Sequence, residues 1–160
     1  MTAVRSRLQY GFTFIEILVA MGIMIMVFTL GVGSYREFAR RQQINSASRD
    51  IKADLRHAQQ EAIVGKKPNH IDCSNSDLIG YRVHYIDNTS YEIIADCVDG
   101  PVSVKTKQYS PDSDIEISPF PDFTFNALAK GVSSSQTIQI TQVSVGVSRD
   151  IQIDQYGEIK

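Results

Sequence analysis

The chain has 160 residues, of which 42% are hydrophobic and 21% are charged, and its formal net charge is −2. This length and composition fit one globular domain with one appended element. A net charge so close to zero excludes the basic field over the whole protein that attracts nucleic acid, which leaves only a local patch to consider.

A basic leader precedes a long apolar run. Arg5 and Arg7 lie near the start, and residues 17–33 contain no charged side chain. Together with residues 12–15, this run has about the length of a helix that crosses a bilayer. Three arginines and one glutamate follow it: Arg36, Arg40, Arg41 and Glu37. Because the basic residues on the two sides nearly balance, the positive-inside rule alone does not orient the segment.

Three interpretations compete for this N-terminus. A cleaved signal peptide would use the small residues 31–33, before Ser34, as its cleavage site. A plain membrane anchor would keep the whole chain. Both leave Glu16, at the edge of the apolar run, as an unexplained cost of roughly 2 to 3 kcal/mol, which is lower near the interface than at the bilayer centre.

The third interpretation depends on residues 11–16, Gly-Phe-Thr-Phe-Ile-Glu, which follow the basic leader and open the apolar run. This motif resembles the type III signal sequence of type IV pilins and type II secretion pseudopilins. The resemblance implies that a prepilin peptidase cleaves between Gly11 and Phe12 and methylates the new N-terminus. It also implies that the leader, residues 1–11, stays in the cytoplasm, which orients the segment.

Glu16 has a physical role in this interpretation. In the mature chain it lies in the first helical turn, where a carboxylate meets the positive end of the helix dipole. It also lies near an α-ammonium group, either its own or that of Phe12 in a neighbouring subunit, and pairing lowers the cost of a charge in an apolar medium. We therefore predict that Glu16 is an assembly residue that sets the register between subunits; an incidental interfacial glutamate is the alternative.

The helical pattern continues beyond the apolar run. Apolar residues recur at spacings of three and four, separated by charged residues that include Asp54: Ile44, Ala47, Ile51, Leu55, Ala58 and Ala62. Because no proline interrupts residues 12–67, we predict one helix, with a transmembrane and assembly half over residues 12–35 and an amphipathic half over residues 36–67. Gly65, two lysines and Pro68 then give a stop signal.

The hydrophobic period changes to two after residue 79. Seven segments read as strands separated by turn residues: 80–86, 90–96, 102–108, 114–117, 123–126, 137–145 and 149–155. They predict a mostly antiparallel sheet over the helix, so residues 68–160 form a globular β-rich head and the fold class is α+β. Together with the leader, this arrangement resembles the pilin fold.

Two patches of the head resemble a narrower group, the GspH/FimT-type minor pilins. Residues 55–63 and 65–68, LRHAQQEAI and GKKP, are similar to the end of the long helix in that group. Residues 151–159, IQIDQYGEI, are similar to its closing strand and turn. Gln59 departs from the pattern, which has arginine at this position.

The chain has two cysteines, Cys73 and Cys97. In an extracytoplasmic head they are candidates for one disulfide, which would close a loop of about two dozen residues and stabilise the fold by roughly 3 kcal/mol. Two unpaired thiols are the alternative, because a sequence does not show whether the Cβ atoms meet. Two cysteines cannot form a four-cysteine structural zinc site.

Other motifs predict no chemistry. His57, His70 and His84 share no metal-ligand spacing. The acids in residues 112–116 could hold calcium, but the stretch is not an EF-hand. The sequence has no nucleophile elbow, phosphate loop or paired acid and base. We therefore expect no enzyme, no cofactor and no metal site.

The resemblance implies a minor pilin or pseudopilin subunit of a type IV pilus or a type II secretion system. Its implied partners are prepilin peptidase, other pilin or pseudopilin subunits and the inner-membrane assembly platform. The subunit would be a single-pass inner-membrane protein with an extracytoplasmic head, and would later lie in the pilus or pseudopilus.

Two alternatives are a FimT-like subunit that binds DNA for uptake, and a plain membrane-anchored binding domain. DNA binding needs a basic surface stripe. The basic residues of the head are instead scattered among acids in the sequence: Lys105, Lys107, Lys130, Arg149 and Lys160. We therefore predict that nucleic acid is not a partner.

Overall fold

The computed structural model describes residues 12–129 and 131–160, with the side chains of residues 30–34 left out of the description. The chain divides into two compact units, Met1–Phe38 and Ala39–Lys160. The second unit, called the head below, contains every strand found among the described residues.

Helix α1 (Phe14–Ile63) contributes residues to both units. We predicted a helix over residues 12–67, so the observed helix begins two residues later and ends four residues earlier. Gly65 has a φ of 65°, and its N–H donates to the Ala62 carbonyl while the N–H of Lys66 donates to the Glu61 carbonyl, each at 3.0 Å. These two bonds form a Schellman motif, which makes Gly65 the helix stop. Among the described residues, none of the helices combines the length and the hydropathy of a membrane-crossing segment.

The larger sheet has four antiparallel strands in the order β3-β2-β1-β5. They are β1 (Leu78–Asp87), β2 (Ser90–Cys97), β3 (Gly100–Gln108) and β5 (Phe123–Asn126). Strand β3 is one of the two outer strands and has a bulge at Val104, where the register with β2 shifts. Lys105 and Lys107 lie opposite Ile93 and Tyr91, which are buried. Both lysines therefore belong to the face of the sheet that packs on α1.

The smaller sheet has three antiparallel strands in the order β4-β6-β7. They are β4 (Ile115–Ile117), β6 (Gln136–Gln142) and β7 (Val147–Ile153). The expectation of one sheet was therefore wrong. Three prolines, at positions 111, 119 and 121, separate β3, β4 and β5, and proline cannot donate to a central ladder. We infer that these breaks let β4 leave the larger sheet and pair with β6.

The strand boundaries agree with the sequence prediction within two residues, except at the end of β6. That strand stops at Gln142 because the chain turns at Gly146, which has a φ of 67° and donates its N–H to the Gln142 carbonyl at 2.9 Å. Two short helices were not predicted: α2 (Ile71–Ser74) and the 3-10 helix η1 (Pro111–Ser113). A polar side chain, from His70 and Ser110 respectively, caps the start of each.

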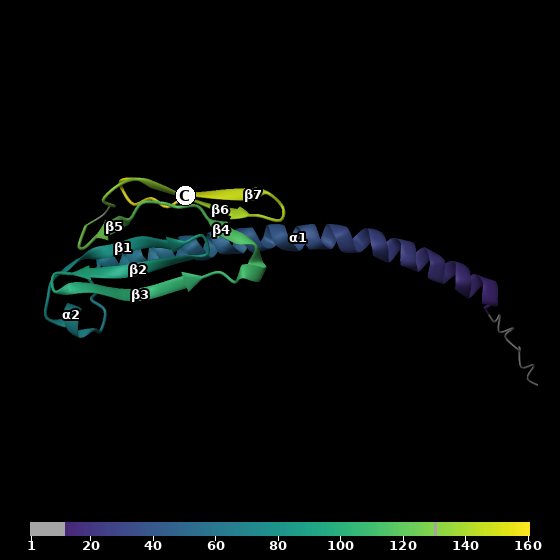
Figure 1. Cartoon of the computed structure of the whole chain (residues 1–160), viewed down its shortest axis with the longest axis horizontal. Helices are drawn as coiled ribbons and strands as arrows, with labels where there is room; N and C mark the ends of the chain where they lie inside the picture. Colours follow the sequence, from purple (N-terminus) through teal and green to yellow (C-terminus); the bar gives the residue numbers. More distant parts are fainter. Residues whose placement is uncertain (1–11, 130) are drawn as a thin grey trace, which may run out of the picture. The chain divides into compact units, whose positions relative to one another are not determined.

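The second half of α1 lies along the sheets of the head (Figure 1), and one hydrophobic core contains residues from this half and from both sheets. The six apolar residues predicted for the buried helix face are all buried: Ile44, Ala47, Ile51, Leu55, Ala58 and Ala62. The larger sheet adds Tyr81, Val83, Phe123 and Phe125, and the smaller sheet adds Ile138, Ile140, Ile151 and Ile153. The α+β class is therefore confirmed, and an antiparallel framework packs on the amphipathic half of α1.

Candidate assembly and processing site

The amino end of α1 carries the acid that interrupts the apolar sequence. The Oγ1 atom of Thr13 accepts a hydrogen bond from the backbone N–H of Glu16 at 3.4 Å, and the Thr13 carbonyl accepts from the same N–H at 3.1 Å. A threonine followed three residues later by a glutamate is a capping-box sequence. This signal was present in the sequence and was missed. Glu16 therefore has a local position in the helix cap in addition to its predicted role in assembly.

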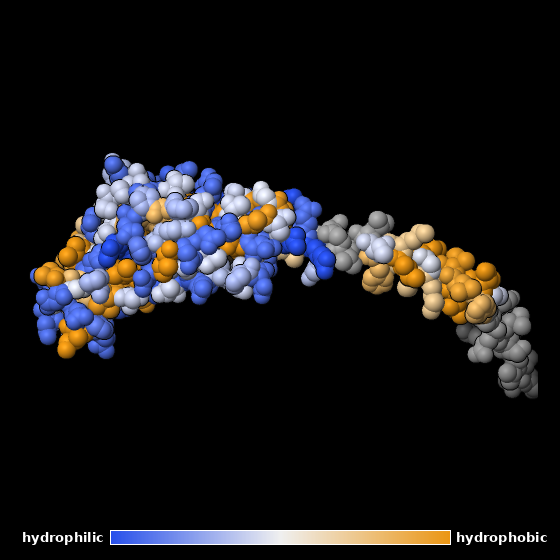
Figure 2. Space-filling view, viewed as in Figure 1, coloured by the Kyte–Doolittle hydropathy of each residue, from blue (hydrophilic) through white to orange (hydrophobic). Residues whose placement is uncertain are grey.

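The side chains around Glu16 are apolar and exposed. Phe12 is 79% exposed and Phe14 is 80% exposed, and every residue from 12 to 29 belongs to the exposed class. Figure 2 shows the apolar colouring of this segment. Glu16 shares a shallow groove with four apolar residues: Ile15, Val19, Ala20 and Ile23. A helix that is apolar on all sides is normally covered by lipid or by protein.

The predicted processing site lies between Gly11 and Phe12. Gly11 and the rest of the leader, including Arg5 and Arg7, fall outside the described residues. Phe12 is the first described residue and precedes the helix. Cleavage and methylation at this position remain predictions.

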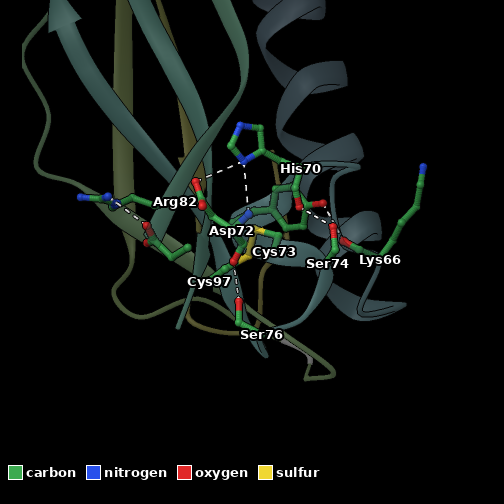
Figure 3. The surroundings of a disulfide bond; sticks show 10 residues. Lys66, His70, Asp72, Cys73, Ser74, Ser76, Arg82 and Cys97 are labelled. Carbon is green, nitrogen blue, oxygen red and sulfur yellow. Dashed lines mark hydrogen bonds and ion pairs between the residues drawn. A yellow bond between two sulfur atoms is a disulfide. The ribbon is translucent and has the colours of Figure 1, made fainter. Parts of the chain in front are cut away.

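Cys73 and Cys97, the candidate pair, form a disulfide in the structure, with their Cα atoms 5.4 Å apart. Figure 3 shows the bond between α2 and the end of β2. Both cysteines are buried in the core. Since α2 belongs to neither sheet, the bond attaches the segment between α1 and β1 to the larger sheet.

A polar cluster fixes α1 to the outer strand β3. Asp54 is a buried acid, and its Oδ2 atom accepts from the Tyr91 hydroxyl at 2.8 Å while its Oδ1 atom accepts from Lys105 Nζ at 2.6 Å. One turn earlier on α1, Asp50 accepts from Lys107 at 3.4 Å. The sequence pattern placed Asp54 among the polar positions between the apolar ones, so its burial is a correction. It is buried because two donors reach it.

The electrostatics of this cluster keep two tyrosines protonated: Tyr91, and Tyr109, whose hydroxyl donates to the Ala47 carbonyl of α1 at 3.3 Å. Burial, and then the nearby Asp54 carboxylate, raise the pKa of Tyr91 well above its usual value of 10. Burial, and then Asp50, raise the pKa of Tyr109 in the same way. A cavity of about 380 Å³ beside the cluster is lined by Ala58, Ile93 and Val104 among others. The two charged residues in the cavity lining, Asp54 and Lys105, pair with each other. The polar cluster therefore links α1 to β3.

The two patches of the GspH/FimT-like resemblance lie against each other. Gln59 Nε2 donates to the Gly157 carbonyl at 2.7 Å, and Arg56 donates to the Ile159 carbonyl at 3.4 Å. Gly157 has a φ of 81°, and a Cβ atom at this position would lie 2.3 Å from Gln59 Nε2. Gln59, which departs from the arginine of the pattern, thus holds the closing turn against the end of α1.

Metal-ligating residues do not gather within the described part of the chain, where no group of three or more histidines, cysteines or acids could hold an ion. The histidines instead pair singly with acids, His84 with Asp122 at 2.8 Å and His70 with Asp72 at 3.2 Å. In the stretch considered for calcium, Glu116 accepts from Asn88.

Of the five basic residues considered for DNA binding, three pair with nearby acids. Lys105 and Lys107 pair with acids of α1, and Lys160 pairs with Glu158 at 3.0 Å. Arg149 donates to Asn45 at 3.3 Å. Lys130 falls outside the described residues. These pairings do not favour a basic stripe.

No family model matches the chain, and neither the curated proteins nor the solved structures give a significant match to it.

Proposed function

We propose that the chain is a minor pilin or pseudopilin subunit of a type IV pilus or a type II secretion system, assembled into a fibre through the first half of α1. The observation that carries the proposal is the exposed apolar surface of residues 12–29, whose sole charged residue is Glu16. A surface of this kind is covered in the working protein. A carboxylate in such a surface is tolerated where it finds a partner.

In this proposal the subunit begins as a single-pass protein of the inner membrane. Prepilin peptidase cleaves after Gly11, and the assembly platform then brings the helices of successive subunits together while the head stays extracytoplasmic. The membrane stage depends on the sequence of residues 12–35, in which residues 17–33 carry no charge. The buried disulfide of the head supports an extracytoplasmic location, since such bonds persist in oxidising compartments.

Glu16 would pair with the α-ammonium group of Phe12 in a neighbouring subunit. Phe12 lies four residues before Glu16, so the group exposed by cleavage would be close to the carboxylate level of the helix. The pair would form only when two helices have the correct register. Cleavage would therefore create the positive charge that the glutamate needs.

The contact between the two head patches supports the narrower assignment to the GspH/FimT-type minor pilins. Gln59 and Arg56 join residues that are about a hundred positions apart in the sequence, at separations of 98 and 103. The patches therefore behave as one structural unit, which is a stronger basis for the assignment than two separate short stretches.

Processing is tested by the intact mass and the N-terminal peptide of the protein recovered from cell membranes. We expect a chain that begins at methylated Phe12. A chain that begins near Ser34 would indicate a secreted head, and a chain that retains Arg5 and Arg7 would indicate a plain anchored domain. Either result would contradict the proposal.

Assembly is tested with two variants that separate the charge of Glu16 from its place in the helix cap. Glu16→Gln removes the charge and keeps a residue that suits a capping box. Thr13→Ala removes the capping side chain and keeps the charge. We expect Glu16→Gln to abolish fibre formation and Thr13→Ala to retain it, measured as sheared fibres by immunoblot. Equal losses in the two variants would show that Glu16 acts through the cap.

A further inference from the structure

Two aromatic residues and one arginine follow the apolar run in the first unit. Tyr35 is 72% exposed, Phe38 is 66% exposed, and Arg36 is also exposed. Successive residues of an α-helix are about 100° apart around the axis, so Tyr35 and Phe38 lie on one side of α1 and Arg36 lies about 100° from Tyr35. Such side chains at the end of an apolar helix are typical of the boundary between lipid and water.

The distance of these residues from the start of α1 is close to the thickness of a bilayer. At about 1.5 Å per residue, the rise from Phe14 to Tyr35 is roughly 32 Å. The hydrocarbon core of a bilayer is about 30 Å thick. When Glu16 lies near one boundary, Tyr35, Arg36 and Phe38 therefore lie near the other.

The positive charge of this stretch favours binding of an anion. Arg36 forms no ion pair or hydrogen bond with another described residue. The sequence continues with Arg40 and Arg41 and has one acid, Glu37, so three arginines and one glutamate give this stretch a net charge of +2. A guanidinium group binds phosphate oxygens through two parallel hydrogen bonds.

We infer that Tyr35, Arg36 and Phe38 form a headgroup collar that binds the phosphates of anionic phospholipids. The inference depends on the membrane stage of the proposed function. The positive charge of this stretch and its distance from Glu16, which is close to the thickness of the hydrocarbon core, favour phospholipid headgroups over a protein partner. The collar would hold the subunit at a fixed depth until it leaves the bilayer.

The test is lipid selectivity measured by electron spin resonance. The full chain is reconstituted in phosphatidylcholine bilayers that contain a trace of spin-labelled phosphatidylglycerol or spin-labelled phosphatidylcholine. We expect the protein to immobilise the anionic lipid about fivefold more strongly, as for one basic residue near a charged surface. The preference should fall in Arg36→Gln, because this change lowers the net charge of the stretch from +2 to +1, and it should also fall at high salt. Arg49→Gln, at another exposed arginine of α1, is the matched control and should keep the preference.

Equal immobilisation of the two lipids would overturn the collar, as would equal losses in Arg36→Gln and Arg49→Gln or a chain that immobilises neither lipid. A protein that shows no preference but needs Arg36 for fibre formation would place this arginine against another subunit.

The proposed function and the collar can be contradicted independently of each other. An uncut leader with an intact lipid preference contradicts only the fibre subunit, and a processed, assembling chain without the preference contradicts only the collar.

Discussion

The two halves of α1 have opposite surfaces. In the first half, residues 12–29 are all exposed, and almost all of them are apolar. In the second half, apolar residues form a narrow face that is fully buried under two sheets, from Ile44 to Ala62. Backbone geometry is the same in both halves. The difference teaches that the second half is covered within the chain, whereas the first half leaves an apolar surface of the kind that lipid or other chains normally cover.

The largest expected effect contrasts one leucine from each half. Leu55 is 0% exposed and Leu18 is 50% exposed. Leu55→Ala leaves a cavity in the core and should lower the free energy of unfolding of the head by about 4 kcal/mol. Leu18→Ala should change it by less than about 0.5 kcal/mol. Urea unfolding followed by tyrosine fluorescence measures both; similar losses would show that the first half also packs within the chain.

The next effect concerns the disulfide, whose two cysteines both lie in the head. Replacing both Cys73 and Cys97 by alanine should lower the free energy of unfolding by roughly 3 kcal/mol, because the unfolded chain gains the entropy of an open loop. The same unfolding measurement on the reduced wild-type protein is the control. A variant as stable as the oxidised protein would mean that the core alone holds α2 in place.

The smallest effect is the response of the head to alkaline pH. The pKa of Tyr91 is raised in the folded state, so above pH 10 the unfolded chain releases a phenolic proton that the folded chain retains. The contribution of Tyr91 to stability should therefore be fully present below pH 10 and should be lost as the pH rises above it. In Tyr91→Phe this decline should be shallower, as measured by melting temperature from pH 7 to about 11. An unchanged decline would assign it to Tyr109 or to other groups.

The regular elements of the fold could be predicted from the sequence because their signals are local. Spacings of three and four marked the buried face of α1, and alternation marked strands such as β7, where Ile151 and Ile153 are buried. Two cysteines limited the disulfide to one pairing. The predicted helix end was four residues too late. The prediction treated Gly65 to Pro68 together as the stop signal, whereas Gly65 alone ends the helix.

The remaining features depend on contacts that no local pattern contains. Asp54 is buried because Tyr91 and Lys105 reach it from 37 and 51 residues further along the chain. The division into two sheets depends on the pairing of β4 with β6, which are far apart in the sequence. The contact of Gln59 with Gly157 depends on the C-terminal turn packing against α1. In the candidate site, by contrast, the Thr13 cap of Glu16 was local and could have been predicted.

The bulge and the helix-facing lysines of β3 have a consequence for solubility. An outer strand presents free N–H and C=O groups with which the strand of another molecule can pair, and this is a common route to aggregation. Strand β3 opposes such pairing with a bulge at Val104, a proline at position 101 and inward-pointing Lys105 and Lys107. The β3 edge of the larger sheet thus resists uncontrolled polymerisation, and in the proposed fibre ordered association would be left to the first half of α1.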